Sequence, residues 1–113
     1  MSKFMQVDIR VIPIYERSLV EQFPRITDLL KQMYYTEPVE KEVSLYALVD
    51  YIVSVTHNPE MPHDIKRKIK PYVQKMLSSK RIAREQLLSK KLNELDKSLY
   101  LIEDQFEDLE GAL

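Results

Sequence analysis

The chain has 113 residues, 44% of them hydrophobic and 31% charged, which is enough for one domain with a single core. Because it contains one glycine and no cysteine, few tight β-turns are expected, and disulfides, thiolate metal sites and cysteine nucleophiles are excluded. The net charge of −1 conceals a basic block over 65–91 and an acidic block over 92–113.

The first residues alternate apolar and polar side chains over 6–12, and this pattern stops at Pro13. Such alternation is typical of a strand, but one short strand is marginal unless it pairs with another. We therefore expect residues 1–13 to form an extended arm that orders against a partner, and the choice between helix and strand over 6–12 stays open.

A helical core is expected over 14–70. Apolar residues follow helical spacing over 14–35, and Pro24 should end one helix near Phe23 and begin the next. Residues 39–56 are apolar almost all round, so they should be buried on every side. The length of that segment favours a helix, although its β-branched end leaves helix and strand open over 49–56.

The rest of the chain reads as a turn followed by helix. Residues 57–62 predict the turn, and a helix should begin near His63. Pro71 is expected to kink or restart that helix. Nothing interrupts helix formation from 72 to about 110, so we expect one long helix over 71–110 that projects beyond the core or packs lengthwise on a partner.

This last segment carries the strongest pattern in the chain. Apolar residues recur at alternating spacings of four and three, as in a coiled-coil seam. The seam residues are Leu88, Leu92, Leu95, Leu99, Ile102, Phe106 and Leu109. Two interpretations stay open: a helical hairpin that folds back on 39–56 within the chain, or an interface with a second copy or another protein.

The basic block is a candidate contact for an acidic partner or for nucleic acid. Its residues include Lys66, Arg67, Lys68, Lys70, Lys75, Lys80, Arg81 and Arg84. A solvated or acid-pairing face is the favoured interpretation, because few aromatic residues are interleaved to stack on bases. The basic and acidic blocks on one helix also favour an antiparallel neighbour.

No group of residues suggests catalysis or a cofactor. His57 and His63 lie six residues apart across a turn, whereas helical metal ligands prefer spacings of three or four. The acidic residues form charge runs, and one glycine cannot build a phosphate loop. We expect no metal, no cofactor and no enzymatic activity.

Two segments resemble the N-terminal helical domain of the inhibitor-of-growth family of chromatin proteins. Residues 19–33 look like the opening helix of that domain, with an apolar residue and proline before a leucine- and methionine-rich helix, and residues 91–104 look like its closing helix. The resemblance implies a helical subunit that docks histone acetyltransferase or deacetylase complexes in the nucleus. Without cysteine, the family's histone-reading finger cannot be carried over.

The sequence thus predicts one all-α domain over 1–113, a helical hairpin or small bundle with a long C-terminal coiled-coil helix. The expected function is a non-catalytic protein-interaction subunit that binds other proteins or itself, as a homodimer or hetero-oligomer. The alternatives are a small viral or bacterial adaptor, chaperone or inhibitor, and then a nucleic-acid binder using 65–91. With no signal-peptide pattern and no apolar run of membrane-spanning length, we expect an intracellular protein with no membrane contact, in the cytoplasm if the resemblance fails.

Overall fold

The computed structural model describes residues 9–113, and every regular element in this range is a helix. The elements are α1 (Leu19–Gln22), α2 (Pro24–Gln32), α3 (Glu37–Glu40), α4 (Leu45–His57), α5 (His63–Leu88) and α6 (Leu92–Ala112). The all-α prediction is therefore confirmed. In the expected N-terminal arm, residues 6–8 lie outside the described residues, and 9–12 form no strand.

The break at Pro24 was predicted correctly, and α1 and α2 each begin with a different local signal. The Ser18 hydroxyl accepts a hydrogen bond from the Glu21 amide at 3.2 Å and starts α1. Pro24 is the first residue of α2, where its missing N–H costs nothing. The helix expected over 14–35 begins only at Leu19, so the residues before Ser18 belong to the arm.

The structure settles the ambiguous segment as helix α4. The Ser44 hydroxyl accepts from the Ala47 amide at 3.1 Å and caps the start of α4, which continues through the β-branched residues to His57. Burial on every side was a wrong prediction. Asp50, Ser54 and His57, spaced four and three residues apart, form one exposed face.

The single long helix expected over 71–110 is also wrong. The turn at 57–62 and the start at His63 are as predicted, but α5 then continues through Pro71 and ends at Leu88. The chain reverses over 89–91 because Lys90 adopts the left-handed region, with φ of 57°. Backbone bonds from Lys91 to Gln86 (2.9 Å) and from Lys90 to Leu87 (3.2 Å) close the end of α5.

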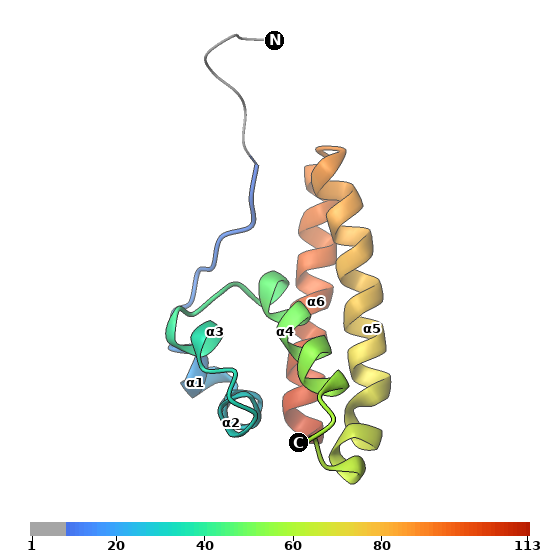
Figure 1. Cartoon of the computed structure of the whole chain (residues 1–113). Helices are drawn as coiled ribbons and strands as arrows, with labels where there is room; N and C mark the ends of the chain where they lie inside the picture. Colours follow the sequence, from blue (N-terminus) through green and yellow to red (C-terminus); the bar gives the residue numbers. More distant parts are fainter. Residues whose placement is uncertain (1–8) are drawn as a thin grey trace, which may run out of the picture.

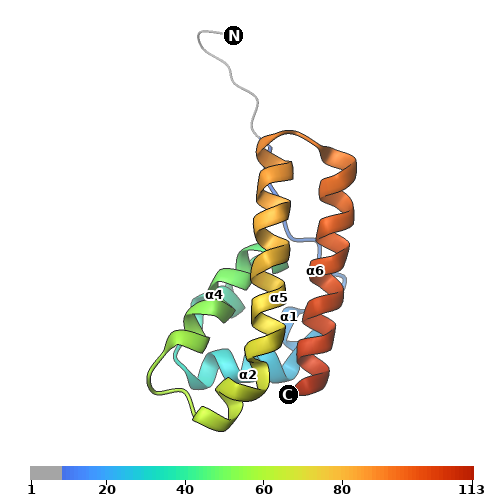
Figure 2. The same ribbon diagram turned by 90° about the vertical axis from the view of Figure 1, so that its right-hand side faces the viewer.

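The resulting α5–α6 hairpin is the long axis of a molecule that measures 51 × 27 × 26 Å. Figures 1 and 2 show α4 lying across one face of the hairpin's lower half, with α1 and α2 beside the lower end of α6. The upper half of the hairpin projects beyond α4. The buried core follows this shape, since Ala83 is the last buried residue of α5 and Leu95 is the first of α6.

Candidate functional site

The seam residues are mostly buried inside the chain. Leu95, Ile102, Phe106 and Leu109 belong to the core, and the ring of Phe106 lies 5.9 Å from that of Phe23 at the start of α2. Leu99 is half-buried. Leu88 and Leu92, at the tip of the hairpin, are 71% and 55% exposed. The lower seam therefore packs α6 against its own chain, and only the tip leaves apolar seam residues facing solvent.

The two helices of the hairpin are held in register by polar contacts rather than by ion pairs. The Ser98 hydroxyl donates to the Gln86 side-chain oxygen at 2.6 Å, and the Gln105 amide donates to the Ser79 hydroxyl at 2.9 Å. Although α5 is basic and α6 acidic, no ion pair joins them among residues 9–113. The charges of both helices thus remain largely available to other molecules.

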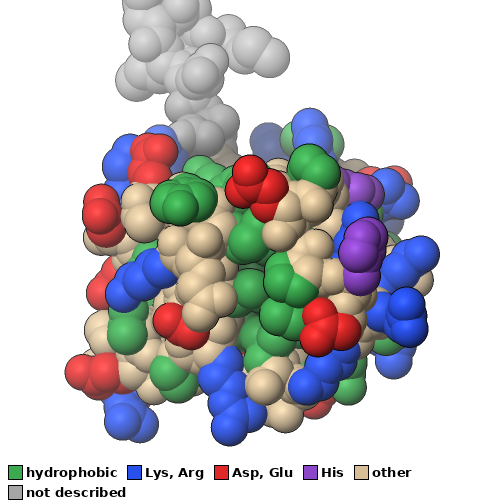
Figure 3. All heavy atoms as spheres, turned by 60° about the horizontal axis from the view of Figure 1, so that its bottom comes forward, with side chains coloured by type: hydrophobic (Ala, Val, Ile, Leu, Met, Phe, Trp, Pro, Cys, Tyr) green, Lys and Arg blue, Asp and Glu red, His purple; other side chains and the backbone are tan. Residues whose placement is uncertain are grey.

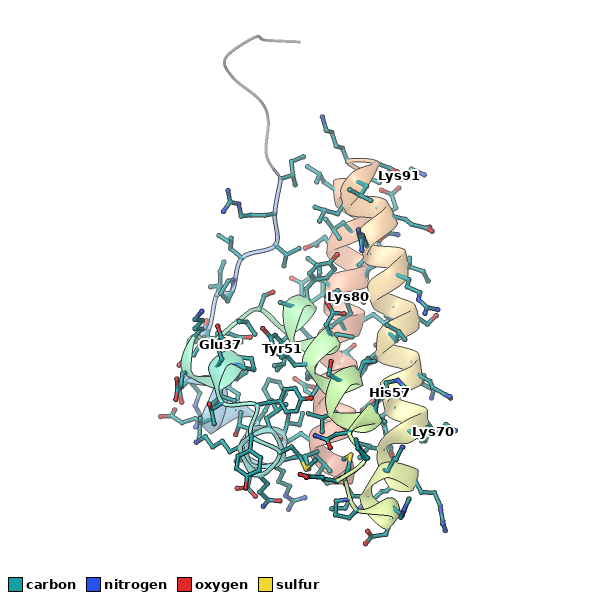
Figure 4. The ribbon with its side chains drawn as sticks, in the orientation of Figure 1. Glu37, Tyr51, His57, Lys70, Lys80 and Lys91 are labelled. Carbon is teal, nitrogen blue, oxygen red and sulfur yellow. The ribbon has the colours of Figure 1, made fainter. Side chains whose placement is uncertain are left out.

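The basic residues of α5 do not form one binding site, because they lie in different surroundings along the helix. Lys80 lies against α4, with Nζ 2.7 Å from an Asp50 carboxylate oxygen and 4.4 Å from the centre of the Tyr46 ring. Lys70 points outward from α5 (Figure 4). Seen from the end opposite the hairpin tip, blue and purple side chains gather on the α5 side (Figure 3). Lys66 is half-buried, and the remaining residues are exposed: Arg67, Lys68, Lys75, Arg81 and Arg84.

A groove that sequence reasoning did not predict lies where the arm, the start of α4 and α6 meet. Its volume is 420 Å³. The lining includes the arm from Val11 to Glu16, Phe23 and Gln22, residues 44–46, and Leu99, Ile102, Glu103 and Glu107 of α6. Apolar side chains form its floor, and the carboxylates of Glu16, Glu103 and Glu107 are its acidic groups. We call it the acid-rimmed groove.

Tyr15 holds the arm beside this groove. The Tyr15 hydroxyl donates a hydrogen bond to the Val43 carbonyl at 2.6 Å, which ties the arm to the connection between α3 and α4. Burial, together with the charges of Glu42 and Glu103, raises the pKa of Tyr15 to about 12. The phenol therefore stays protonated at neutral pH and remains a hydrogen-bond donor to the backbone.

The rim of the groove carries negative charge that no ion pair within residues 9–113 neutralises. Partial burial raises the pKa of Glu103, and the neighbouring Asp104, Glu107 and Asp96 raise it further. Neither Glu103 nor Glu107 forms an ion pair within the described part of the chain. The carboxylates of this rim would therefore attract a cation, which would not have to displace an ion-pair partner from residues 9–113.

Sequence patterns gave no signal for the groove. Glu103 and Glu107 read as ordinary charged neighbours of the seam, and the arm residues come from the opposite end of the chain. The pairing of the arm with α6 depends on Tyr15 and on the hairpin turn at Lys90, neither of which has a local motif. Only the tertiary structure brings these segments together.

Two other kinds of feature, a metal site and a membrane-spanning helix, are not found among the described residues. Within residues 9–113, no group of three or more His, Cys, Asp and Glu residues is arranged to hold a metal ion. No helix of this part of the chain has the length and apolar character needed to cross a membrane. Comparison with protein-family models, curated proteins and solved structures found no match. The resemblance to the inhibitor-of-growth family thus stays a prediction.

Proposed function

We propose that this chain is a non-catalytic helical adaptor that binds a segment of a partner protein in the acid-rimmed groove. The observation that carries the proposal is the groove itself: 420 Å³ of space with an apolar floor and a charged rim. Ligand sites combine an apolar lining with a few placed polar groups in this way. The arm adds exposed apolar surface beside the groove, since Ile12 and Ile14 are 63% and 86% exposed.

The chemistry of the lining favours binding over catalysis. Tyr15 lines the groove and has its pKa raised to about 12, but its hydroxyl is already used to hold the arm. The acidic side chains face a partly open groove rather than a closed pocket that could separate an acid from a base. The groove is therefore suited to hold a side chain of a partner.

Site-specific photo-crosslinking tests this proposal. A photoreactive amino acid at Ile14, beside the groove, should attach covalently to one protein in cells that produce the chain. The same group at Ser78, which is exposed on α5 and does not line the groove, is the matched control. Adducts at Ile14 that are absent at Ser78 would support the groove as the binding site. Equal adducts at both positions, or none at either, would contradict it.

A narrower form of the proposal follows from the two segments that resemble the inhibitor-of-growth family. In that form the partner is a subunit of a histone acetyltransferase or deacetylase complex. Mass spectrometry of the Ile14 adducts decides it, because a partner of unrelated function would leave a dedicated adaptor, chaperone or inhibitor instead.

A second candidate function is nucleic-acid binding through α5. It is favoured by one observation: Arg67, Arg81 and Arg84 are exposed and form no ion pair among residues 9–113. Affinity for a DNA duplex should then fall steeply as salt rises, because phosphate contacts release counterions. Affinity that ignores salt, or that persists in an Arg81→Gln/Arg84→Gln variant, would exclude this function.

A further inference from the structure

We propose that the segment bound in the acid-rimmed groove is cationic and amphipathic, with apolar side chains for the floor and lysine or arginine for the rim. This inference rests on the proposed function and specifies the chemistry of the partner. The electrostatics of the groove and a contact elsewhere in the molecule both support it.

The groove offers two kinds of contact side by side. Leu45, Leu99 and Ile102 supply apolar surface from two helices. Glu103 and Glu107 lie one helical turn apart on α6, so their carboxylates project along the same side of that helix. A bound segment with apolar residues on one face and basic residues beside them would satisfy both at once.

The arm adds a further carboxylate to the lining of the groove. Glu16 lines the same groove and follows directly after Tyr15, which is anchored to Val43. Carboxylates therefore come from both the arm and α6. A segment bound in the groove would meet negative charge from both elements, which favours a basic partner and disfavours an acidic one.

The chain already shows how a lysine fits such a place. The Lys80 side chain is only 12% exposed although its ammonium group pairs with Asp50, because the stem lies against α4 and the head lies over the Tyr46 ring. Here an apolar surface and a carboxylate, carried on a neighbouring helix, hold one lysine. The acid-rimmed groove repeats this combination, but the described chain supplies no cation to it.

The basic residues of α5 do not fill this role. They lie on a different helix from the rim and form no ion pair with α6 within residues 9–113. Burial and the neighbouring charges of Asp104, Glu107 and Asp96 raise the pKa of Glu103, as expected where like charges lie close together. A cationic ligand would offset the repulsion between these carboxylates, and this relief would contribute to the free energy of binding.

Three synthetic peptides test the inference. The first is helical with leucine on one face and lysine on the other; the second replaces lysine with glutamate, and the third replaces leucine with serine. Binding is followed by fluorescence anisotropy, and the site by the methyl NMR signals of Leu99 and Ile102. We expect the leucine–lysine peptide alone to bind and to shift both signals.

Paired variants of α6 separate local contacts from net charge. Glu103→Gln with Glu107→Gln should weaken binding of the leucine–lysine peptide by about tenfold or more, the effect of roughly 1.4 kcal/mol. Glu94→Gln with Asp108→Asn removes the same charge from exposed positions of α6 that do not line the groove. An equal loss in both pairs would overturn the inference, because it would show attraction by net charge alone.

The other outcomes separate this inference from the proposed function. If the leucine–glutamate peptide shifts the Leu99 and Ile102 signals as strongly, the groove binds peptides but the cationic requirement is wrong. If no peptide shifts these signals, the inference fails, and crosslinking at Ile14 then decides independently whether the groove binds a protein at all.

Discussion

Within residues 9–113, three non-glycine residues occupy the left-handed region of the backbone: Tyr34, Glu42 and Lys90, with φ of 66°, 46° and 57°. Each directly follows the C-cap residue of a helix, α2, α3 or α5. In each case the two amides that follow the helix bond back to its last carbonyls, as Tyr35 does to Leu30 at 2.8 Å. Glycine normally takes this position because it has no Cβ to crowd the following carbonyl. These three turns therefore store backbone strain, and no glycine in the sequence marks their positions.

Lys90→Gly should stabilise the chain. A glycine at this position removes the left-handed penalty, and we expect the free energy of unfolding in urea to rise by about 1 kcal/mol. Ser89→Gly is the matched control, because Ser89 has an ordinary φ of −89° and gains no relief from glycine. Equal effects of the two substitutions would show that strain at Lys90 is not what the glycine removes.

Glu103→Gln should also stabilise the chain at neutral pH. The folded structure raises the pKa of Glu103 above its ordinary value of 4.5, so its ionised form is less favourable in the folded chain than in the unfolded one. This unfavourable contribution is present at neutral pH and disappears as pH falls through the raised pKa toward 4.5. The melting temperature of the variant should exceed that of the original chain at neutral pH, and the gap should close in acid.

Glu94→Gln controls for the loss of one negative charge, because Glu94 is an exposed α6 residue outside the groove. A gap that persists unchanged in acid, or that Glu94→Gln reproduces, would contradict the cause assigned to Glu103. A carboxylate that destabilises the fold is expected in a binding groove, because a residue that binds a partner need not stabilise the folded chain.

At the scale of the element, α2 depends on a residue from the far end of the chain. Phe23, at its start, provides no side-chain cap, and the Glu110 carboxylate of α6 accepts instead from the amides of Arg25 at 2.9 Å and Ile26 at 3.0 Å. A carboxylate at a helix N-terminus accepts hydrogen bonds from free N–H groups and interacts favourably with the helix dipole. This contact joins α2 to the end of α6.

Glu110→Ala should therefore destabilise the chain by about 1 to 2 kcal/mol, the usual cost of losing a cap. Glu110→Gln should lose less, because its amide oxygen still accepts a hydrogen bond. Asp108→Ala, an exposed substitution on the same helix, is the control and should change urea unfolding little. A similar loss for Asp108→Ala would mean that the loss at Glu110 is not specific to its hydrogen bonds with α2.

The sequence predicted those elements whose boundaries have local signals. Pro24 begins a helix, and residues 57–62 contain the asparagine and prolines of a turn, so both boundaries were found. The end of α5 was missed because Lys90 occupies a position where glycine is the usual signal. The exposed face of α4 was missed because only Asp50, Ser54 and His57 mark it among many apolar residues.

The candidate site was predictable only in part, for a physical reason. Along α6 the seam follows from helical spacing, and its residues Leu95, Ile102, Phe106 and Leu109 are buried within the chain, whereas Leu88 belongs to α5. The groove needs Tyr15 against Val43 and the arm against Glu103, contacts between segments far apart in sequence. Such contacts come from packing, which no local pattern encodes.

At the scale of the whole molecule, the seam divides into a buried part and an exposed tip, and this division predicts the effects of substitutions. Phe106→Ala removes a fully buried ring that packs on Phe23 and should cost about 3 to 5 kcal/mol. Leu92→Ala, at the exposed tip, should cost less than about 1 kcal/mol in the same urea unfolding experiment. Similar costs at both positions would mean that the tip is buried in solution.

The same division addresses the interpretation of the seam as an interface between chains. Because the lower seam is used within the chain, Leu88 and Leu92 are the seam residues that stay exposed for a second copy, and two such side chains form a small patch. In addition, two hairpins packed tip to tip with α5 on α5 would bring basic helices together, which opposes association. We expect light scattering to give the mass of one chain at every concentration. A mass that rises with concentration, and returns to one chain in a Leu88→Ser/Leu92→Ser variant, would instead identify the hairpin tip as the surface through which two copies associate.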